Sequence, residues 1–112
     1  MSIASSRSSK APQTISDEEA EAATKEEIHK MSILLGKAIR ARRLEKEMTQ
    51  LDLATYAELD PNFIGFVERA ERRVTLYNAW RIAGGLGISL AELVAPLPTR
   101  KIRVVKKPSR RS

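Results

Sequence analysis

Residues 49–69 read TQLDLATYAELDPNFIGFVER and contain two short helix patterns in close succession. Thr49 is placed as the N-cap of a helix over residues 50–57. Asp60-Pro61 repeats the start signal, because an N-cap residue is followed by a proline at the first helical position. A second helix is therefore predicted over residues 61–69, separated from the first by a turn.

Further helices are predicted on both sides of this pair. Apolar residues recur at three- and four-residue spacings over residues 32–46 and again over residues 76–86, where Gly87 is placed to end the helix. A last short helix is expected over residues 89–94. No segment alternates apolar and polar residues for long enough to predict a strand within the core, so the expected fold class is all-α with five core helices. The positions expected on buried faces are Leu35, Ala38, Ile39, Leu53, Ala54, Ala57, Phe63, Ile64, Val67, Leu76, Ala79, Trp80 and Ala83.

Two unlike charges fall on these apolar faces. Leu35, Ile39 and Arg43 follow one another at four-residue intervals, and Ile64 and Glu68 have the same spacing in a later helix. A buried arginine without a partner is very costly, so we expect a hydrogen-bonded pair of Arg43 with Glu68 that fastens the two helices together. The alternative is that both side chains curl outward to solvent.

The net charge of +6 is unevenly distributed along the chain. Residues 1–32 carry four basic and six acidic side chains, residues 33–98 carry nine and eight, and residues 99–112 carry seven and none. Because the basicity belongs to the C-terminal tail, the high pI is by itself poor evidence for a nucleic-acid-binding domain.

Several classes of protein are disfavoured by the composition. The chain has no cysteine and one histidine, which argues against a disulfide framework, a metal site and a catalytic constellation, and no glycine-rich phosphate loop follows a strand. We therefore expect no enzyme and no cofactor. No apolar run approaches the roughly 18 residues of a membrane span, and the first residues lack the apolar part of a secretion signal. We expect a cytoplasmic protein without membrane contact.

The order and spacing of these patterns resemble a known family, the lambda-repressor-like helix-turn-helix proteins of the Cro/XRE class. The likeness covers residues 33–94. Residues 72–76 and 88–93 also resemble the short controller proteins of restriction–modification systems. The stretches that carry the family resemblance are Leu35 to Arg43, Thr49-Gln50, Leu53-Ala54, Ile64, Val67-Glu68-Arg69, Leu76, Ile82-Ala83 and Leu86.

The resemblance implies that the helix at residues 61–69 enters the major groove of double-stranded DNA. In the family, the groove-facing positions correspond here to Pro61, Asn62, Gly65 and Phe66. Asn62 would pair with adenine and Phe66 would offer apolar contact to a thymine methyl group. The phosphate contacts would come from Gln50, Arg69, Arg72 and Arg73.

Each of these assignments has a plain structural alternative. Asn62 can be an exposed residue of a helix start, and Phe66 can be packed in the core or in a protein contact. Gln50 can make a hydrogen bond near the helix cap, and the arginines can form a solvated face.

The sequence departs from the family at turns where the family usually has glycine. Glu47, Glu58 and Ala70 occupy these positions. If the turns need positive φ, each substitution costs about 1 kcal/mol. Gly65 and the pair Gly84-Gly85 lie inside predicted helices, which costs about 1 kcal/mol per glycine relative to alanine. We expect a domain less stable than its relatives.

The chain is expected to divide into four segments. Ser16 and Glu19 form a capping box before an Ala- and Glu-rich stretch with a thin apolar stripe, which predicts a marginal helix or one ordered by a partner. The segments are a disordered N-terminal arm over residues 1–15, an extra helix over residues 16–31, a helix-turn-helix DNA-binding domain over residues 32–95 and a basic tail over residues 96–112.

The basic tail has two interpretations. As a disordered arm it would add nonspecific phosphate affinity that salt removes. Residues 102–105 are also β-prone and could pair as a strand with a second copy or with another protein.

The expected function is transcriptional regulation by sequence-specific binding of double-stranded DNA as a homodimer. The alternative is an antitoxin-like or other protein-interaction module, whose N-terminal segment or tail binds a protein partner.

Overall fold

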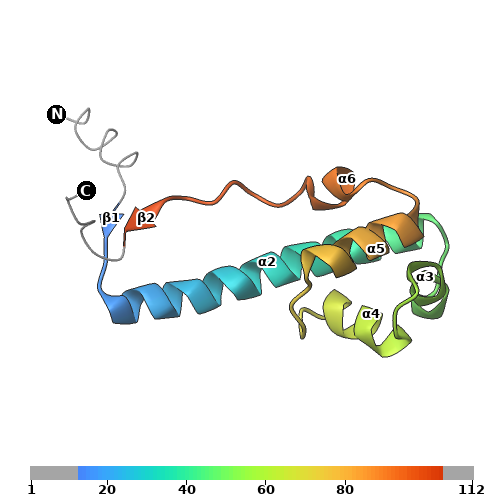
Figure 1. Ribbon diagram of the computed structural model, residues 1–112, viewed down its shortest axis with the longest axis horizontal. Helices are drawn as coiled ribbons and strands as arrows, with labels where there is room; N and C mark the ends of the chain where they lie inside the picture. Colours follow the sequence, from blue (N-terminus) through green and yellow to red (C-terminus); the bar gives the residue numbers. More distant parts are fainter. Residues whose placement is uncertain (1–12, 105–112) are drawn as a thin grey trace. The chain divides into compact units, whose positions relative to one another are not determined.

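The computed structural model describes residues 13–104, and its fold is all-α, as predicted. Two strands of two residues each lie outside the helical core. The elements in chain order are β1 (Gln13–Thr14), α2 (Asp17–Glu45), α3 (Gln50–Ala57), α4 (Pro61–Glu68), α5 (Leu76–Leu86), α6 (Leu90–Val94) and β2 (Arg103–Val104) (Figure 1).

The chain divides into two compact units. The larger unit comprises Glu27–Pro98, within which the predicted domain of residues 32–95 lies. In it, α3 packs against α4 and α5, and α5 packs against α6, while Ile39 and Arg43 join the C-terminal half of α2 to this core. The smaller unit comprises Met1–Glu26 and Thr99–Ser112.

In the smaller unit, β1 and β2 pair in parallel, with Gln13 opposite Arg103 and Thr14 opposite Val104. The prediction of a disordered arm over residues 1–15 is therefore wrong at residues 13–14, and residues 1–12 lie outside the described part. Residues 103–104 of the β-prone stretch do form a strand, but its partner strand belongs to the same chain and not to a second copy or another protein. Residues 105–112 of the expected basic arm also lie outside the described part.

The prediction of separate helices over residues 16–31 and 32–46 is wrong, because α2 runs without a break from Asp17 to Glu45. The expected capping box starts it: Glu19 N donates to Ser16 Oγ (3.1 Å) and Ser16 N donates to Glu19 Oε1 (3.0 Å). The stretch contains no proline and is rich in alanine, glutamate, lysine and leucine, all of which favour helix. The apolar stripe becomes broader after about residue 32. This change affects how much of α2 is buried, but it does not end the helix.

The start and stop signals of the shorter helices act as expected. Thr49 Oγ1 accepts from the N3 amide of α3 (3.0 Å), and Asp60 Oδ1 accepts from the second residue of α4 (2.7 Å). Gly87 ends α5 in the left-handed conformation, with φ 73°. Ser89 is the N-cap of α6, and α4 ends one residue before the predicted end, with Arg69 as its C-cap.

The buried core joins side chains from all five helices of the larger unit. Its fully or nearly fully buried members are Ile39, Leu53, Ala54, Ile64, Val67, Ile82, Ala83, Leu86 and Leu93. Two predicted core positions are wrong: Leu76 is 74% exposed and Trp80 is 61% exposed. Helical spacing from Ala83 made both look buried, but the face of α5 that packs inward carries Ala79, Ile82 and Leu86 instead.

All three turn positions without glycine have positive φ. The values are 56° at Glu47, 59° at Glu58 and 62° at Ala70. A side chain with a Cβ atom is unfavourable in this left-handed region, so each turn carries local strain.

The pair expected between Arg43 and Glu68 is formed in the structure. Arg43 Nε donates to Glu68 Oε2 (2.6 Å) and Nη2 donates to Oε1 (2.9 Å), while Nη1 donates to the Met48 carbonyl (2.8 Å). The Arg43 and Glu68 side chains are 7% and 3% exposed. The hydrogen bond with Glu68 raises the pKa of Arg43 above its ordinary value, although burial opposes this shift. This bidentate pair fastens α4 to α2.

Gly36 lets the two helices approach closely beside this pair. A Cβ atom at Gly36 would lie 2.5 Å from the Val67 carbonyl oxygen and 2.8 Å from that of Glu68, which the backbone cannot tolerate. The last turn of α4 therefore rests directly on the backbone of α2.

We expect Arg43→Ala to lower the free energy of unfolding by about 3–5 kcal/mol, because it removes the buried cation that donates two hydrogen bonds to the buried Glu68 carboxylate. Arg40→Ala is the matched control. The Arg40 side chain is 59% exposed and its Nη1 lies 3.9 Å from Glu68 Oε1, so its removal should cost less than about 1 kcal/mol. Urea unfolding followed by circular dichroism measures both, and equal small losses would contradict the role given to the pair.

Ala70→Gly should raise the free energy of unfolding by about 1 kcal/mol, because glycine adopts positive φ without the Cβ clash. The same substitution at Ala41, an exposed position inside α2, should lower it by about 1 kcal/mol. Opposite signs for two identical exchanges would establish the strain, whereas a loss in both variants would exclude it.

Candidate nucleic-acid interface

Helices α3 and α4 follow each other after a turn of three residues, and α5 holds this turn in place. Arg81 Nε donates to the Ala57 carbonyl (2.9 Å), and its Nη2 donates to the carbonyl and to the carboxylate Oε1 of Glu58 (both 3.1 Å). The last carbonyls of a helix lack intrahelical partners, so Arg81 satisfies groups that would otherwise face water. Its Nη1 also donates to the Tyr77 hydroxyl.

The first turn of α4 is presented to solvent. Pro61 and Asn62 are both exposed, whereas Ile64 and Val67 on the opposite side are buried in the core. Of the positions expected to face a base, these two are accessible. Gly65 is buried, so it has no surface of its own to offer a base.

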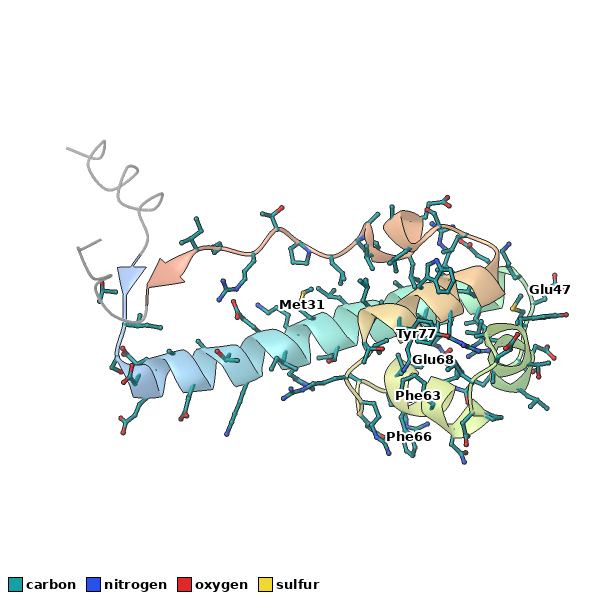
Figure 2. All side chains as sticks on the ribbon, viewed as in Figure 1. Met31, Glu47, Phe63, Phe66, Glu68 and Tyr77 are labelled. Carbon is teal, nitrogen blue, oxygen red and sulfur yellow. The ribbon has the colours of Figure 1, made fainter. Side chains whose placement is uncertain are left out.

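Phe66 lies half-buried on the side of α4 that faces away from α2, whereas Glu68 lies between the two helices (Figure 2). Its ring is close to two guanidinium groups. The Cζ atoms of Arg72 and Arg69 lie 4.7 Å and 5.4 Å from the ring centroid, within the range of cation–π attraction. The alternative that places Phe66 in the core is therefore wrong, whereas its contact with another protein stays a prediction.

The three arginines expected to meet phosphates are all exposed and follow one another after α4. Arg69 also bonds Glu71: Nε donates to the carboxylate Oε2 (3.2 Å), with both side chains about half exposed. An exposed pair of this kind is weak, so it leaves Arg69 available to an anion. The arrangement concentrates positive charge at the C-terminal end of α4.

Gln50 lies at the first position of α3, and its side chain is engaged within the protein. Its Nε2 donates to Glu68 Oε1 (3.1 Å), the same carboxylate that binds Arg43. This bond reaches a side chain of α4 and is not the expected hydrogen bond near the helix cap, and the phosphate role of Gln50 stays a prediction.

Arg81 and Tyr77 are two residues of the site that the sequence prediction missed. Their spacing of four residues within one helix was a usable signal for a side-chain contact. The bond from Arg81 to the end of α3 spans more than twenty residues, so no local pattern could reveal it.

Within residues 13–104, no group of three or more histidine, cysteine, aspartate or glutamate side chains could hold a metal ion. None of the helices in that range is long and apolar enough to cross a bilayer.

Comparison with known proteins agrees with this geometry. The family model described as helix-turn-helix matches residues 39–93. The control protein C.MunI of a Mycoplasma species is 34% identical over 61 residues, which are 82% of its length and 52% of this chain.

Solved structures show the same likeness. The restriction–modification controller protein C.AhdI from Aeromonas hydrophila is 35% identical, with a TM-score of 0.54 over 55% of this chain and 94% of that protein. The clp gene regulator ClgR from Corynebacterium glutamicum is 26% identical, with a TM-score of 0.56 over 59% of this chain and 86% of that protein.

The helix-turn-helix match and the regulatory proteins among the relatives identify the chain as a DNA-binding regulatory protein and not as an enzyme. The chain belongs to the helix-turn-helix family of the Cro/XRE type, and restriction–modification controller proteins are among its homologues.

Proposed function

We propose that this regulator reads an operator through α4 in the major groove and does so as a homodimer. The observation that carries the proposal is the exposed first turn of α4, with Pro61 and Asn62 at the surface while its buried side is held by Arg43. A helix fixed in this way can present its N-terminal residues to base edges and loses little conformational entropy on binding. Because its target is genomic DNA, we place its action in the cytoplasm.

Asn62 is the residue proposed to read a base. Its side-chain amide can donate one hydrogen bond to N7 of adenine and accept one from the N6 amino group. Pro61 beside it offers only apolar contact. We therefore expect α4 to read only a few base pairs directly, so the sequence specificity of one domain is low.

The arginines after α4 are proposed to bind phosphates. Arg69, Arg72 and Arg73 are exposed and adjacent, and the start of α3 adds backbone N–H donors at Gln50. Such contacts fix register and orientation on the duplex and do not depend on base sequence.

The dimer surface is proposed to be the outer face of α5. Leu76, Tyr77 and Trp80 are 74%, 58% and 61% exposed, and the rings of Tyr77 and Trp80 lie 6.0 Å apart between centroids. Three large apolar side chains together on one helix are typical of a protein contact. A second copy is the natural occupant, because one domain spans only a few base pairs and such regulators bind paired half-sites.

The two glycines of α5 have separate surroundings. A Cβ atom at Gly85 would lie 3.0 Å from Ala57 N, so Gly85 lets α5 approach α3 within the chain. A Cβ atom at Gly84 would meet nothing within 4 Å. Of the two glycines, only Gly84 is therefore open to a second copy.

The function is tested by selecting bound duplexes from a randomised pool at near-physiological salt, with the full chain and with a shortened chain ending at Pro98. We expect both to enrich the same inverted repeat, because the proposed reader lies within residues 27–98. No enrichment with the full chain, or binding that disappears with the tail, would instead indicate nonspecific electrostatic binding by residues 99–112.

Asn62→Ala should relax the preference at one base pair of each half-site, at a cost of about 1–3 kcal/mol for the preferred base. Arg72→Ala is the contrasting variant. It should weaken binding to all sequences about equally and reduce the salt slope by about one. An unchanged preference profile for Asn62→Ala would remove it as a reader.

Trp80→Ser should weaken the homodimer by about thirtyfold, because it removes a large exposed apolar side chain from each side of the proposed contact. Analytical ultracentrifugation measures the association. Leu44→Ser is the matched control, since Leu44 is 51% exposed on α2 and lies outside the surface of α5. A dimer that tolerates Trp80→Ser as well as Leu44→Ser would place the contact elsewhere.

A further inference from the structure

We propose that Phe66 is a positioning residue that holds the guanidinium groups of Arg69 and Arg72 ready for DNA phosphates, and that it does not read a base. The inference rests on the proposed function of α4. It changes the role that the family resemblance gives to this position.

The first observation is that the aromatic ring is already in use. Arg72 and Arg69 lie 4.7 Å and 5.4 Å from the ring centroid of Phe66. A ring close to two cations has less surface to offer a thymine methyl group. The attraction also reduces the freedom of two long side chains, which lowers the entropy lost when they meet phosphates.

The second observation explains how residues 66, 69 and 72 come together. Arg69, the C-cap residue of α4, lies three residues after Phe66, so the spacing of the last helical turn places it on the same side. Arg72 lies beyond the helix and needs a reversal of the chain. Ala70 supplies it with φ 62°, and Glu71 N closes the turn by donating to the Phe66 carbonyl (2.8 Å). The strained turn thus returns Arg72 to the ring.

The third observation concerns the residue before Phe66. A Cβ atom at Gly65 would lie 3.1 Å from Arg69 Nη1, closer than ordinary van der Waals contact. A Cβ atom would also lie 3.3 Å from Gln50 Oε1, so a side chain at position 65 would require Arg69 and Gln50 to shift by a few tenths of an ångström. Gly65 and Phe66, which the family resemblance assigned to base contact, instead lie against the guanidinium of Arg69.

Charge completes the argument for a phosphate ligand. The acidic neighbour is Glu71, whose bond to Arg69 is exposed at 3.2 Å and easily replaced by a phosphate oxygen. Planar guanidinium groups match phosphate geometry, and two of them held against the same ring bind a DNA backbone with little reorganisation.

The test uses the full chain with Phe66→Leu, which keeps apolar volume but removes the π face, and Phe66→Tyr, which keeps both. Binding is measured on the selected duplex and on single base-pair variants of it. Phe66→Leu should weaken every duplex by about threefold, and Phe66→Tyr should bind like the wild type. A loss confined to one base pair would overturn the proposal and make Phe66 a reader.

A double-mutant cycle separates action through the arginines from direct contact. In a chain carrying Arg69→Gln and Arg72→Gln, Phe66→Leu should have almost no further effect on affinity, because the groups it positions are gone. A threefold loss that persists in this background would overturn the proposal. Thermal unfolding of each variant shows whether the fold is intact.

Nuclear magnetic resonance tests the placement of the two arginines on Phe66 without DNA. The side-chain protons of Arg69 and Arg72 should show ring-current shifts that vanish in Phe66→Leu and persist in Phe66→Tyr. Unshifted signals in the wild type would overturn the placement of the arginines. If these shifts are present but no duplex is bound, the placement of the arginines on Phe66 is correct and the proposed DNA-binding function is wrong. If a duplex is bound but the shifts are absent, the placement of the arginines is wrong and the DNA-binding function stands.

Discussion

The bidentate bond between Arg43 and Glu68 is the interaction on which the presentation of α4 depends. It joins two helices through charges that are almost fully buried, so neither side chain can leave without stranding the other. The same carboxylate accepts from Gln50, and the same guanidinium donates to the Met48 carbonyl. One ion pair therefore fixes α4 relative to α2, to the start of α3 and to the turn at Met48 that joins α2 to α3.

The fixed helix divides its surface among three tasks. Ile64 and Val67 fill the core, and Glu68 receives the ion pair. The outward side carries Asn62 at its start and Phe66 near its end, where the arginines gather. Strained turns flank this arrangement, since Glu58 precedes α4 and Ala70 follows it with positive φ. The chain thus combines a firmly held reading helix with connections that cost stability.

The matched family region leaves the smaller unit outside it. Residues 39–93 match the family model, whereas the first half of α2 and the strand pair lie beyond these limits. The paired strands bring basic residue Arg103 opposite Gln13 and so join the two ends of the described chain. Likeness to relatives therefore explains the DNA-binding domain but not these additions.

The sequence by itself determined the helix boundaries after residue 45, because Thr49, Asp60 and Gly87 act through neighbours a few residues away. It also predicted the Arg43–Glu68 pair, since burial of either charge alone is too costly, but only the packing of α4 on α2 excluded the alternative in which both side chains face solvent. Only the tertiary structure decided that Trp80 is exposed and that Phe66 meets two arginines. Helical spacing defines which residues share a face, whereas the packing of α5 against α3 and the reversal at Ala70 decide what each face meets.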